Sequence, residues 1–471
     1  MKTLSQLWSI MRASRADPET VAQLQQKRLA QLVSYARGHS PFYTRLLNDL
    51  PAHWSLTDIP PVTKTQLMAQ FDDWVTDPSI TQAEINTFIG DPARVGQKFK
   101  GAYTVWTTSG STGQPSIFLH GAGASGLYDL LWLWRGFRPW LGLWAMPMTL
   151  RREFRETFVI ATGGHFAGAV SAAHLGRKYR WLQNSIKVLS ILSPLPELIQ
   201  ALNQEQPTLL TIYPSALILL AAAQSSGQLA IKPKCIITSG EGLTPAVQAQ
   251  AEAAFGCPVR EIYACSEAMF MAFRCEEGWL HLNADWYILE PVDEAYRPVP
   301  PGTPSHTVLL TNLANHIQPI IRYNLGDSIT MRPDACSCGN PLPALRVEGR
   351  QGDILNFVAA DGEMVLILPL ALETVVENAG GVRHYQLIQT APDCLTVRLE
   401  AEPGYDLAEV RLRIGRELER FLARQGVRDA IVRHDATVPQ RDPRTGKYRQ
   451  VWSELREPAG HAVGHAAIHR P

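Results

Sequence analysis

Between residues 100 and 350, short runs rich in β-branched residues alternate with windows of helical periodicity. The strand candidates are FVIAT (158–162), TLLTI (208–212), KCIITSG (234–240) and TVLLTNL (307–313), and the helical windows are 194–203, 215–224 and 244–255. Strands that alternate with helices are typical of a sheet with helices packed on its faces. This stretch is therefore predicted to have an α/β fold.

The pattern changes after Arg350. A helix is predicted at 367–378, strands near 383–390 and 394–400, and an amphipathic helix at 407–424, which together indicate a smaller α+β domain. Because 471 residues are too many for one compact core, we expect separate domains. The expected divisions are an N-terminal domain of residues 1–349, a C-terminal domain of residues 350–456 and a flexible tail of residues 457–471.

Charge and hydropathy argue against two classes of protein. The 44 Lys and Arg residues balance 44 Asp and Glu residues, whereas nucleic-acid-binding proteins usually carry a basic excess. The longest uncharged stretch, 206–231, is interrupted by Pro207 and Pro214, which favours a buried helix over a membrane span. The first residues lack the apolar core of a signal peptide, and seven cysteines do not suit a disulfide scaffold. We therefore expect a cytoplasmic protein with no nucleic-acid or membrane partner.

The segment TTSGSTGQP (107–115) follows a short strand candidate, YTVW (103–106). Its small residues let the backbone turn tightly, and their N–H and O–H groups can surround a phosphate. It is not a Walker A loop, because no lysine follows a glycine at the required position. A flexible linker is the alternative, but linkers seldom follow an aromatic-rich strand directly. The residues predicted to hold phosphate are Thr107, Ser109, Gly110, Ser111, Thr112 and Gly113.

Further motifs follow along the chain: TSGEGL (238–243), REIYACSEA (260–268), IIRYNLGD (320–327), VEGRQGD (347–353) and VPQRDPRTGKYRQ (438–450). In this order and spacing they resemble the adenylate-forming superfamily of acyl- and aryl-CoA synthetases. The YARGHSPFY segment (35–43), the YPS step (213–215) and the absence of a lysine after Pro115 resemble its phenylacetate–CoA ligase branch. The resemblance covers nearly the whole chain, and it implies a large multi-sheet adenylation domain followed by a small mobile domain.

The resemblance also implies a reaction, in which a carboxylate is joined to the α-phosphate of ATP and pyrophosphate leaves. The residues that it assigns to the nucleotide are Ser239, Gly240 and Glu241 beside the adenine, Tyr263 stacked on it, Ser266, and Asp327 on the ribose hydroxyls. Glu267 would bind Mg²⁺, for which carboxylate oxygen is a suitable ligand. Arg350 would hold ribose or phosphate near the hinge, and Lys447 would stabilise charge in the transition state.

Each of these residues also has an ordinary explanation when it is taken alone. Asp327 could be a turn residue, Arg350 a surface arginine and Lys447 a solvated lysine, and only the matched contexts favour functional roles. The chain departs from the family pattern at Ala264, where a glycine beside the acyl-adenylate is usual, and at Gly352, where a second acidic residue is usual. These departures concern the acyl pocket and the hinge.

Three cysteines and one histidine form a separate candidate site. Cys275 and His281 lie in one segment, and Cys336 and Cys338 follow in a C-x-C-G turn after 54 intervening residues. Three thiolates and an imidazole are the ligands of a closed tetrahedral zinc site. The resemblance supports this prediction, because some members of the phenylacetate–CoA ligase branch carry such a zinc. The alternative is three unconnected reduced cysteines and a histidine on a strand. We favour a structural Zn²⁺.

The acyl pocket is less well marked. Residues 132–166 are rich in tryptophan and end in ATGGHFAG, where His165 and Phe166 follow two glycines that allow a close approach. This composition favours an aromatic or apolar carboxylic acid, although tryptophan-rich stretches are often core, and Ala264 is a further pocket candidate.

We therefore expect a ligase that forms an acyl-adenylate and then a thioester with CoA or with the phosphopantetheine of a carrier protein. One alternative is an enzyme that passes the acyl or AMP group to a non-thiol acceptor, and another is a nucleotide-binding protein without turnover. A homodimer is left open.

Overall fold

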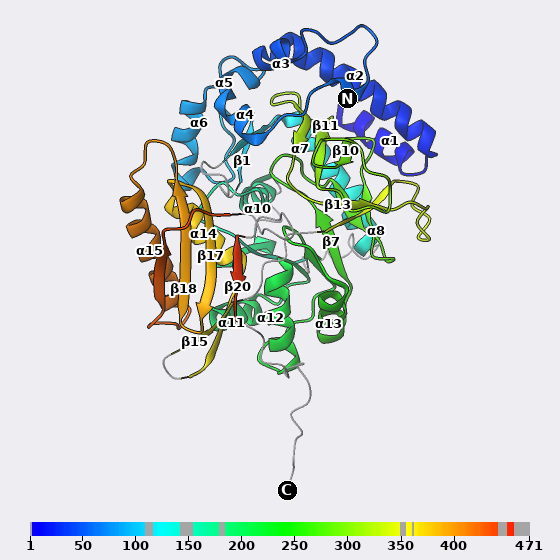
Figure 1. The fold of residues 1–471 in the computed structure, drawn as a ribbon. Helices are drawn as coiled ribbons and strands as arrows, with labels where there is room; N and C mark the ends of the chain where they lie inside the picture. The colour runs from blue at the N-terminus through cyan, green and yellow to red at the C-terminus, as the bar shows by residue number, and fades with distance from the viewer. Residues whose placement is uncertain are drawn as a thin grey trace. The chain divides into compact units, whose positions relative to one another are not determined.

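The computed structural model describes residues 2–108, 116–141, 154–178, 184–348, 355–359, 362–440 and 450–455. The chain divides into two compact units (Figure 1), of which the first comprises the described residues up to 348 and the second those from 355 onward.

The N-terminal part of unit 1 is helical, as its spacing of apolar residues predicts. Figure 1 shows these helices, in blue, gathered at one end of the unit. They are α1 (Lys2–Ala13), α2 (Pro18–His39), α3 (Pro41–Leu46), α4 (Lys64–Ala69), α5 (Phe71–Trp74) and α6 (Gln82–Ile89), with short 3-10 turns at η1 (Leu56–Asp58) and η2 (Pro92–Arg94). Asp17 starts α2 by accepting a hydrogen bond from the Thr20 N–H, and Pro18 occupies the first turn, where its missing N–H is not needed.

A nine-stranded sheet forms the centre of unit 1, in the order β13-β14-β9-β8-β7-β6-β5-β3-β4. Its parallel half consists of β3 (Glu156–Ile160), β4 (Ile186–Ser190), β5 (Leu209–Ile212), β6 (Cys235–Thr238) and β7 (Val259–Tyr263). The antiparallel half consists of β8 (Ala272–Arg274), β9 (Leu280–Leu282), β13 (Ile329–Met331) and β14 (Ala344–Val347). The predicted α/β architecture is confirmed.

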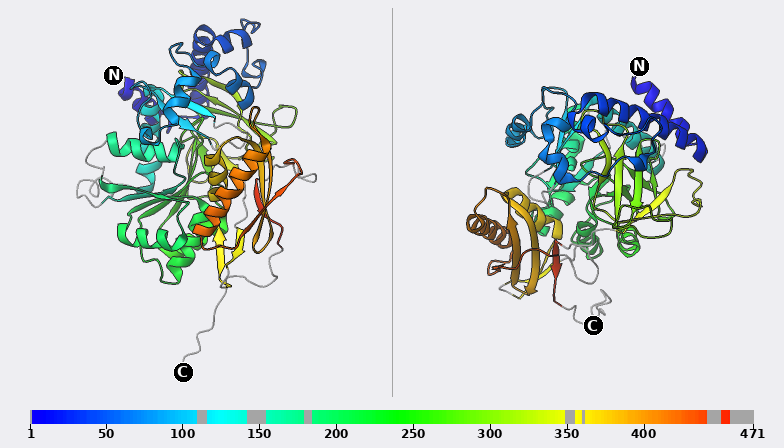
Figure 2. Two further views of the ribbon diagram at one scale, coloured as in Figure 1. Left: turned by 90° about the vertical axis from the view of Figure 1, so that its left-hand side faces the viewer. Right: turned by 45° about the horizontal axis from the view of Figure 1, so that its top comes forward.

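Helices connect the parallel strands and cover both faces of the sheet. They are α10 (Ala167–Lys178), α11 (Leu195–Glu205), α12 (Pro214–Ser225) and α13 (Pro245–Phe255). The chain passes from β3 to β4 in one direction across the sheet, and from β4 to β5, β6 and β7 in the opposite direction. Because crossovers between parallel strands are right-handed, α10 lies on one face of the sheet and α11 to α13 lie on the other. Figure 2 shows helices on both sides of these strands.

The uncharged stretch 206–231 contains β5 and α12. Eight residues of α12 are buried, and its apolar side chains surround the whole helix, which is the pattern of a helix inside a protein core. Within the described ranges, none of the helices combines the length and the apolar character needed to cross a lipid bilayer. The prediction of a buried helix is confirmed.

Two smaller sheets complete unit 1. One is the hairpin of β1 (Thr104–Thr107) and β2 (Ile117–His120), and the other has the order β10-β11-β12, with β10 at Tyr287–Val292, β11 at Thr307–Asn312 and β12 at Ile320–Asn324. The helices α7 (Ala122–Leu131) and α8 (Arg138–Leu141) flank a π-helical turn, η3 (Trp132–Phe137).

One carboxyl group is buried within the large sheet. Glu156 begins β3, is 5% exposed and accepts a hydrogen bond from the Thr211 hydroxyl at 3.2 Å. Burial raises the pKa of Glu156 to about 7, because the charged form loses its hydration. Glu156 lies at the amino end of its strand.

Unit 2 contains the hairpin of β15 (Leu355–Val358) and β16 (Met364–Ile367) and a four-stranded sheet in the order β19-β18-β17-β20. The sheet strands are β17 (Val382–Ala391), β18 (Cys394–Ala401), β19 (Ile431–Asp435) and β20 (Val451–Ser453), and the helices are α14 (Pro369–Ala379) and α15 (Leu407–Arg424). One face of α15 is buried through Val410, Ile414, Leu418, Phe421 and Leu422, whose spacing of three and four residues is that of an amphipathic helix. Figure 2 shows α15, in orange, lying along this sheet.

Candidate active site

The five parallel strands of unit 1 end at one edge of the sheet, and segments singled out in the sequence follow them there. The GGHF segment follows β3, Tyr213 follows β5, Ser239 to Glu241 follow β6, and Ala264 to Glu267 follow β7. Ligands of α/β proteins bind at the carboxyl ends of parallel strands, where the loops can be varied without disturbing the sheet. This edge is therefore the candidate site.

Thr107, the last residue of β1, is the point where three of the predicted segments meet. Its backbone N–H donates to the His165 carbonyl at 2.9 Å. Its carbonyl accepts a hydrogen bond from the Ser266 hydroxyl at 3.3 Å. The start of the predicted phosphate loop is thus held between the GGHF segment and the ACSEA segment, although the three lie far apart in the sequence.

The YACSE and YNLGD motifs are joined by two side-chain hydrogen bonds. The Tyr263 hydroxyl donates to Asp327 Oδ2 at 2.8 Å, and the Tyr323 hydroxyl donates to Glu267 Oε1 at 2.9 Å. Glu267 and Tyr323 are 5% and 2% exposed, and burial raises the pKa of Tyr323 well above its ordinary value, as does the adjacent carboxylate. The two carboxylates that the family resemblance assigned to the ribose and to Mg²⁺ therefore lie in one cluster.

Cys265 lies within this cluster but is not set up as a nucleophile. Burial raises the pKa of its thiol well above the ordinary value, and the nearby Glu267 and Asp327 carboxylates raise it further. A thiol is reactive only as the thiolate, so this cysteine stays protonated.

The loop after β6 is held by a close contact and by a helix end. Gly240 has a φ of +86°, and a Cβ at this position would lie 2.9 Å from the Tyr213 ring, so a glycine is required. The Glu241 carboxylate accepts hydrogen bonds from the Ser215 N–H and hydroxyl, at 2.8 and 2.9 Å, in the first turn of α12. Burial raises the pKa of Glu241, and these two hydrogen bonds oppose the rise. The Glu241 side chain thus anchors the loop on which Ser239 and Gly240 lie.

Lys64 is a cation that the sequence reasoning missed. Its ammonium group donates to the Thr108 hydroxyl at 3.1 Å, at the start of the predicted phosphate loop. Thr63 caps the helix that Lys64 begins, and Val62 forms a parallel bridge with Tyr323 in the YNLGD motif. The PPVTK segment contains the lysine, but a contact with a residue 44 positions later could not be inferred from it.

His165 is buried, with 2% of its surface exposed, and neither ring nitrogen has a hydrogen-bond partner among the described residues. Its ring lies 5.2 Å from the Phe88 ring, and Phe166 is half-buried beside it. Burial lowers the pKa of His165, so the imidazole is neutral near pH 7. The Asp91 backbone opposes this lowering, so the imidazole has a polar group beside it.

The tryptophan-rich segment packs within a cluster of aromatic rings. Trp132 stacks on Phe270 at 5.7 Å, and Trp140 meets Phe273 edge-on at 5.6 Å. Phe270 follows the ACSEA segment, so this cluster adjoins the loop that carries Glu267.

Cys275, His281, Cys336 and Cys338 come together as predicted, with their ligand atoms all within 4.8 Å of one another. The Cys275 and Cys336 sulfurs are 3.8 Å apart, which matches the separation of about 3.8 Å in a zinc tetrahedron with Zn–S bonds of about 2.3 Å. His281 Nδ1 donates to the Leu342 carbonyl at 2.8 Å, which leaves Nε2, 3.2 Å from the Cys338 sulfur, as the ligand atom. The four residues fit a tetrahedral metal ion.

The remaining candidate residues lie outside the described residues. They are Ser109, Gly110, Ser111, Thr112, Gly113, Arg350 and Lys447. Their predicted roles stay predictions.

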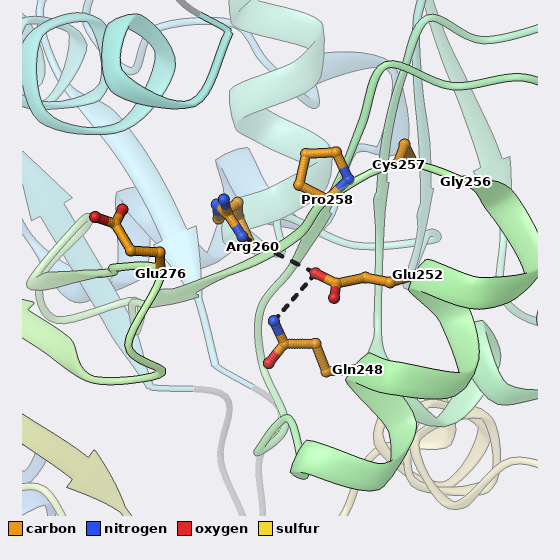
Figure 3. Close-up of a pocket in the computed structure, with 7 residues that line it drawn as sticks. All are labelled: Gln248, Glu252, Gly256, Cys257, Pro258, Arg260 and Glu276. Atoms are coloured by element: carbon orange, nitrogen blue, oxygen red, sulfur yellow. Dashed lines mark hydrogen bonds and ion pairs between the residues drawn. The ribbon is translucent and has the colours of Figure 1, made fainter. Parts of the chain in front are cut away.

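A hollow of about 450 Å³ lies at the other end of β7, beside the amino-terminal residues of the strand. Figure 3 shows its lining, in which Glu252 is 4.0 Å from Arg260 and accepts a hydrogen bond from Gln248 at 3.1 Å. Arg260, Glu252 and Gln248 are thus paired with one another, and the hollow is separate from the candidate site.

Comparison with known proteins agrees with the motifs. No model of a known protein family matches the chain. The Staphylococcus aureus protein CapK is 22% identical over 433 residues, which cover 84% of this chain and 82% of that protein. The phenylacetate-coenzyme A ligase of Thermus thermophilus is 22% identical over 444 residues, which cover 88% of this chain and 86% of that enzyme.

Solved structures share the fold. The structure of 2-hydroxyisobutyryl-CoA ligase in complex with 2-HIB-AMP and CoA in the thioesterification state aligns with a TM-score of 0.56 and 22% identity, over 94% of this chain and 91% of that one. The postadenylation state of the same ligase aligns with a TM-score of 0.54. The resemblance drawn from the motifs is confirmed.

Proposed function

We propose that the chain is an ATP-dependent ligase of the adenylate-forming superfamily, which activates a small carboxylic acid as an acyl-adenylate and transfers the acyl group to a thiol. The observation that carries the proposal is the pair of hydrogen bonds that joins YACSE to YNLGD, Tyr263 to Asp327 and Tyr323 to Glu267. These bonds bring the candidate ribose-binding and metal-binding carboxylates together at the edge of the sheet where nucleotides bind.

In the first half-reaction, an oxygen of the substrate carboxylate attacks the α-phosphorus of ATP, and the bond to pyrophosphate breaks. The phosphates would lie in the 107–113 loop, with the Lys64 ammonium at its start. Asp327 would accept the ribose hydroxyls, and Glu267 would hold Mg²⁺, which neutralises phosphate charge when bound. Lys447 would stabilise the charge that develops between the carboxylate and the α-phosphate.

In the second half-reaction, the thiol attacks the acyl carbonyl, the acyl–S bond forms, the thiol loses its proton and AMP leaves. We propose that residues 350–456 form a mobile lid that carries Lys447 for the first half-reaction. CoA is the first acceptor to test, because a relative is named a phenylacetate-coenzyme A ligase and CoA is bound in the similar ligase structure. A carrier-protein pantetheine is the second.

For the acid, the aromatic cluster around Trp132 and Phe270 favours an aromatic or apolar substrate. His165 is the polar group proposed to meet it, because its buried ring nitrogens have no partner among the described residues.

We propose that Cys275, His281, Cys336 and Cys338 hold a structural Zn²⁺. Four protein ligands leave no open position for catalysis. His281 is on β9, and β9 pairs with β14, so the ion would fix the 332–343 loop onto the antiparallel half of the sheet.

Carboxylate-dependent pyrophosphate exchange over a panel of aromatic and aliphatic acids tests the proposal, followed by thioester formation with CoA and with a carrier protein. Exchange with at least one acid is expected, and ATP binding without exchange for any acid would refute the ligase. Lys447→Ala should abolish exchange yet still convert a supplied acyl-adenylate to the thioester. The exposed Lys232→Ala is the matched control, and equal loss of both half-reactions would contradict the role of Lys447.

A further inference from the structure

A buried chain of hydrogen bonds lies behind the peptide that links Ser266 to Glu267. It is formed by His120 at the end of β2, Tyr128 in α7 and Asn312 at the end of β11. His120 and Asn312 are fully buried, and Tyr128 is 3% exposed. The sequence motifs did not include any of these three residues.

The donor and the acceptor of each bond in this hydrogen-bond chain can be assigned without ambiguity. The Ser266 carbonyl can only accept, so His120 Nε2, 2.9 Å away, carries the proton and donates. Burial lowers the pKa of His120 to about 3, so its ring is neutral and Nδ1 accepts from the Tyr128 hydroxyl at 3.0 Å.

The hydrogen-bond chain continues from Tyr128 to the next carbonyl of the same loop. The Tyr128 oxygen accepts from the Asn312 amide nitrogen at 3.2 Å, and this nitrogen also donates to the Glu267 carbonyl at 3.0 Å. The Asn312 amide oxygen accepts from the Ala314 N–H at 3.0 Å, which sets the orientation of the amide. Two successive carbonyls of the loop are therefore held by one connected set of side chains.

The hydrogen-bond chain is also packed against the strand that leads to the phosphate loop. The Trp106 ring lies 4.1 Å from the His120 ring and 5.8 Å from the Tyr128 ring. Trp106 directly precedes Thr107, whose carbonyl accepts from the Ser266 hydroxyl at 3.3 Å. The orientation of the Ser266–Glu267 peptide is thus tied to the phosphate-loop strand on one side and to β11 on the other.

We propose that His120 and Tyr128 are positioning residues that fix the Ser266–Glu267 peptide so that the Glu267 carboxylate meets the metal–nucleotide complex. This inference rests on the proposed function. The carboxylate direction follows from the main chain at Glu267, and both carbonyls that define this main chain are held by the hydrogen-bond chain. Buried polar networks of this kind specify a geometry more than they add stability, because apolar residues of the same volume would serve a purely structural core.

The test compares Tyr128→Phe with Tyr287→Phe in the full-length enzyme. Tyr287 is also fully buried, and its hydroxyl donates at 2.6 Å to the Met269 carbonyl of the same loop, so both variants lose one hydroxyl near the loop. Tyr128→Phe should raise the Mg²⁺ concentration for half-maximal pyrophosphate exchange about fivefold, which is the effect of one net hydrogen bond. The KM of the acid should change less than twofold, and Tyr287→Phe should leave the Mg²⁺ dependence within twofold.

A second pair of variants separates the hydrogen-bond chain from simple packing. His120→Gln keeps an N–H donor for the Ser266 carbonyl and should recover part of the Mg²⁺ affinity that His120→Phe loses. If the His120 variants do not fold, the comparison of Tyr128→Phe with Tyr287→Phe alone decides whether the positioning role holds. Equal Mg²⁺ dependence in Tyr128→Phe and Tyr287→Phe, or an unchanged Mg²⁺ dependence in Tyr128→Phe, would overturn the inference.

Calorimetric titration of ATP at several Mg²⁺ concentrations provides a readout that needs no acid. If the wild-type enzyme binds Mg²⁺–ATP but exchanges no pyrophosphate, the ligase proposal fails, and the positioning role is judged from binding alone. If the wild type does not bind Mg²⁺–ATP, both proposals fail.

Discussion

Glu156→Gln replaces the carboxyl group buried at the start of β3 with a neutral amide of the same size. Burial raises the pKa of Glu156 from 4.5 to about 7, so the folded chain holds this proton more tightly than the unfolded chain does. Below pH 4.5, Glu156 is protonated in both the folded and the unfolded state, so its ionisation does not change the free energy of unfolding. Between pH 4.5 and 7 the unfolded state ionises first, so stability falls as the pH rises, and the loss is complete above pH 7.

The magnitude follows from the size of the shift. At about 1.4 kcal/mol per pKa unit, the full difference amounts to about 3 kcal/mol at pH 8. The variant should therefore gain stability relative to the wild type steadily from pH 5 to pH 7 and hold that gain at pH 8. Any effect of the amide on packing or on the Thr211 hydrogen bond is independent of pH, so it shifts the free energy of unfolding by the same amount at every pH.

Urea unfolding of wild type and variant, followed by tryptophan fluorescence at pH 5, 6, 7 and 8, measures this difference. The exposed Glu197→Gln is the matched control and should follow the wild type. Parallel stability curves for wild type and Glu156→Gln across this range would refute the reasoning. Exchange activity should not change, because Glu156 lies at the end of the sheet opposite the candidate site.

Three further changes test the site. Treatment with a chelator should release about one zinc ion per chain and lower the Tm. Cys338→Ser should likewise contain less zinc and have a lower Tm. Purified wild-type protein with well under one zinc per chain would count against the site. Gly240→Ala should destabilise the chain by about 1–2 kcal/mol because alanine disfavours the positive φ. It should also raise the KM of ATP, because the new Cβ would lie 2.9 Å from the Tyr213 ring and displace the loop. Gly227→Ala has a similar φ of +80° with nothing within 4 Å, so it should show only the first effect, and equal KM values would argue against an ATP-binding role for the loop. Lys64→Met should raise the KM of ATP at least tenfold and leave the KM of the acid within twofold. The control Lys232→Met should change neither KM. An unchanged KM of ATP in Lys64→Met would exclude Lys64 from phosphate binding.

Much of the fold was predictable because its signals are local. The amphipathic spacing of α15 locates the helix at Leu407–Arg424, and alternation of strands with helices predicts the parallel half of the sheet. The carboxyl ends of parallel strands share one edge, so motifs that follow β6 and β7 were bound to lie near each other.

The unpredicted features depend on contacts between distant segments. Glu241 was assigned to the adenine from its motif, but nothing in that motif indicates that the first turn of α12 would bind its carboxylate. Lys64 and His120 carry no motif at all, and each acquires its place only when another strand packs beside it. The antiparallel half of the sheet was not predicted, because its strands are only three or four residues long and a local pattern does not determine which strand pairs with which.

The N-terminal segment that ends at Lys64 also has a consequence for synthesis of the chain. Arg322, buried and held in the left-handed region at a φ of +49°, donates to the Ile59 carbonyl at 2.6 Å, across 263 positions of sequence. At about 5–20 residues per second, a ribosome needs roughly 15 to 50 s to deliver the second partner after the first. During that time the apolar faces of the first helices have no β12 to pack beside, and they are candidates for chaperone binding. The segment that carries Lys64 is thus made well before the strand beside which it docks.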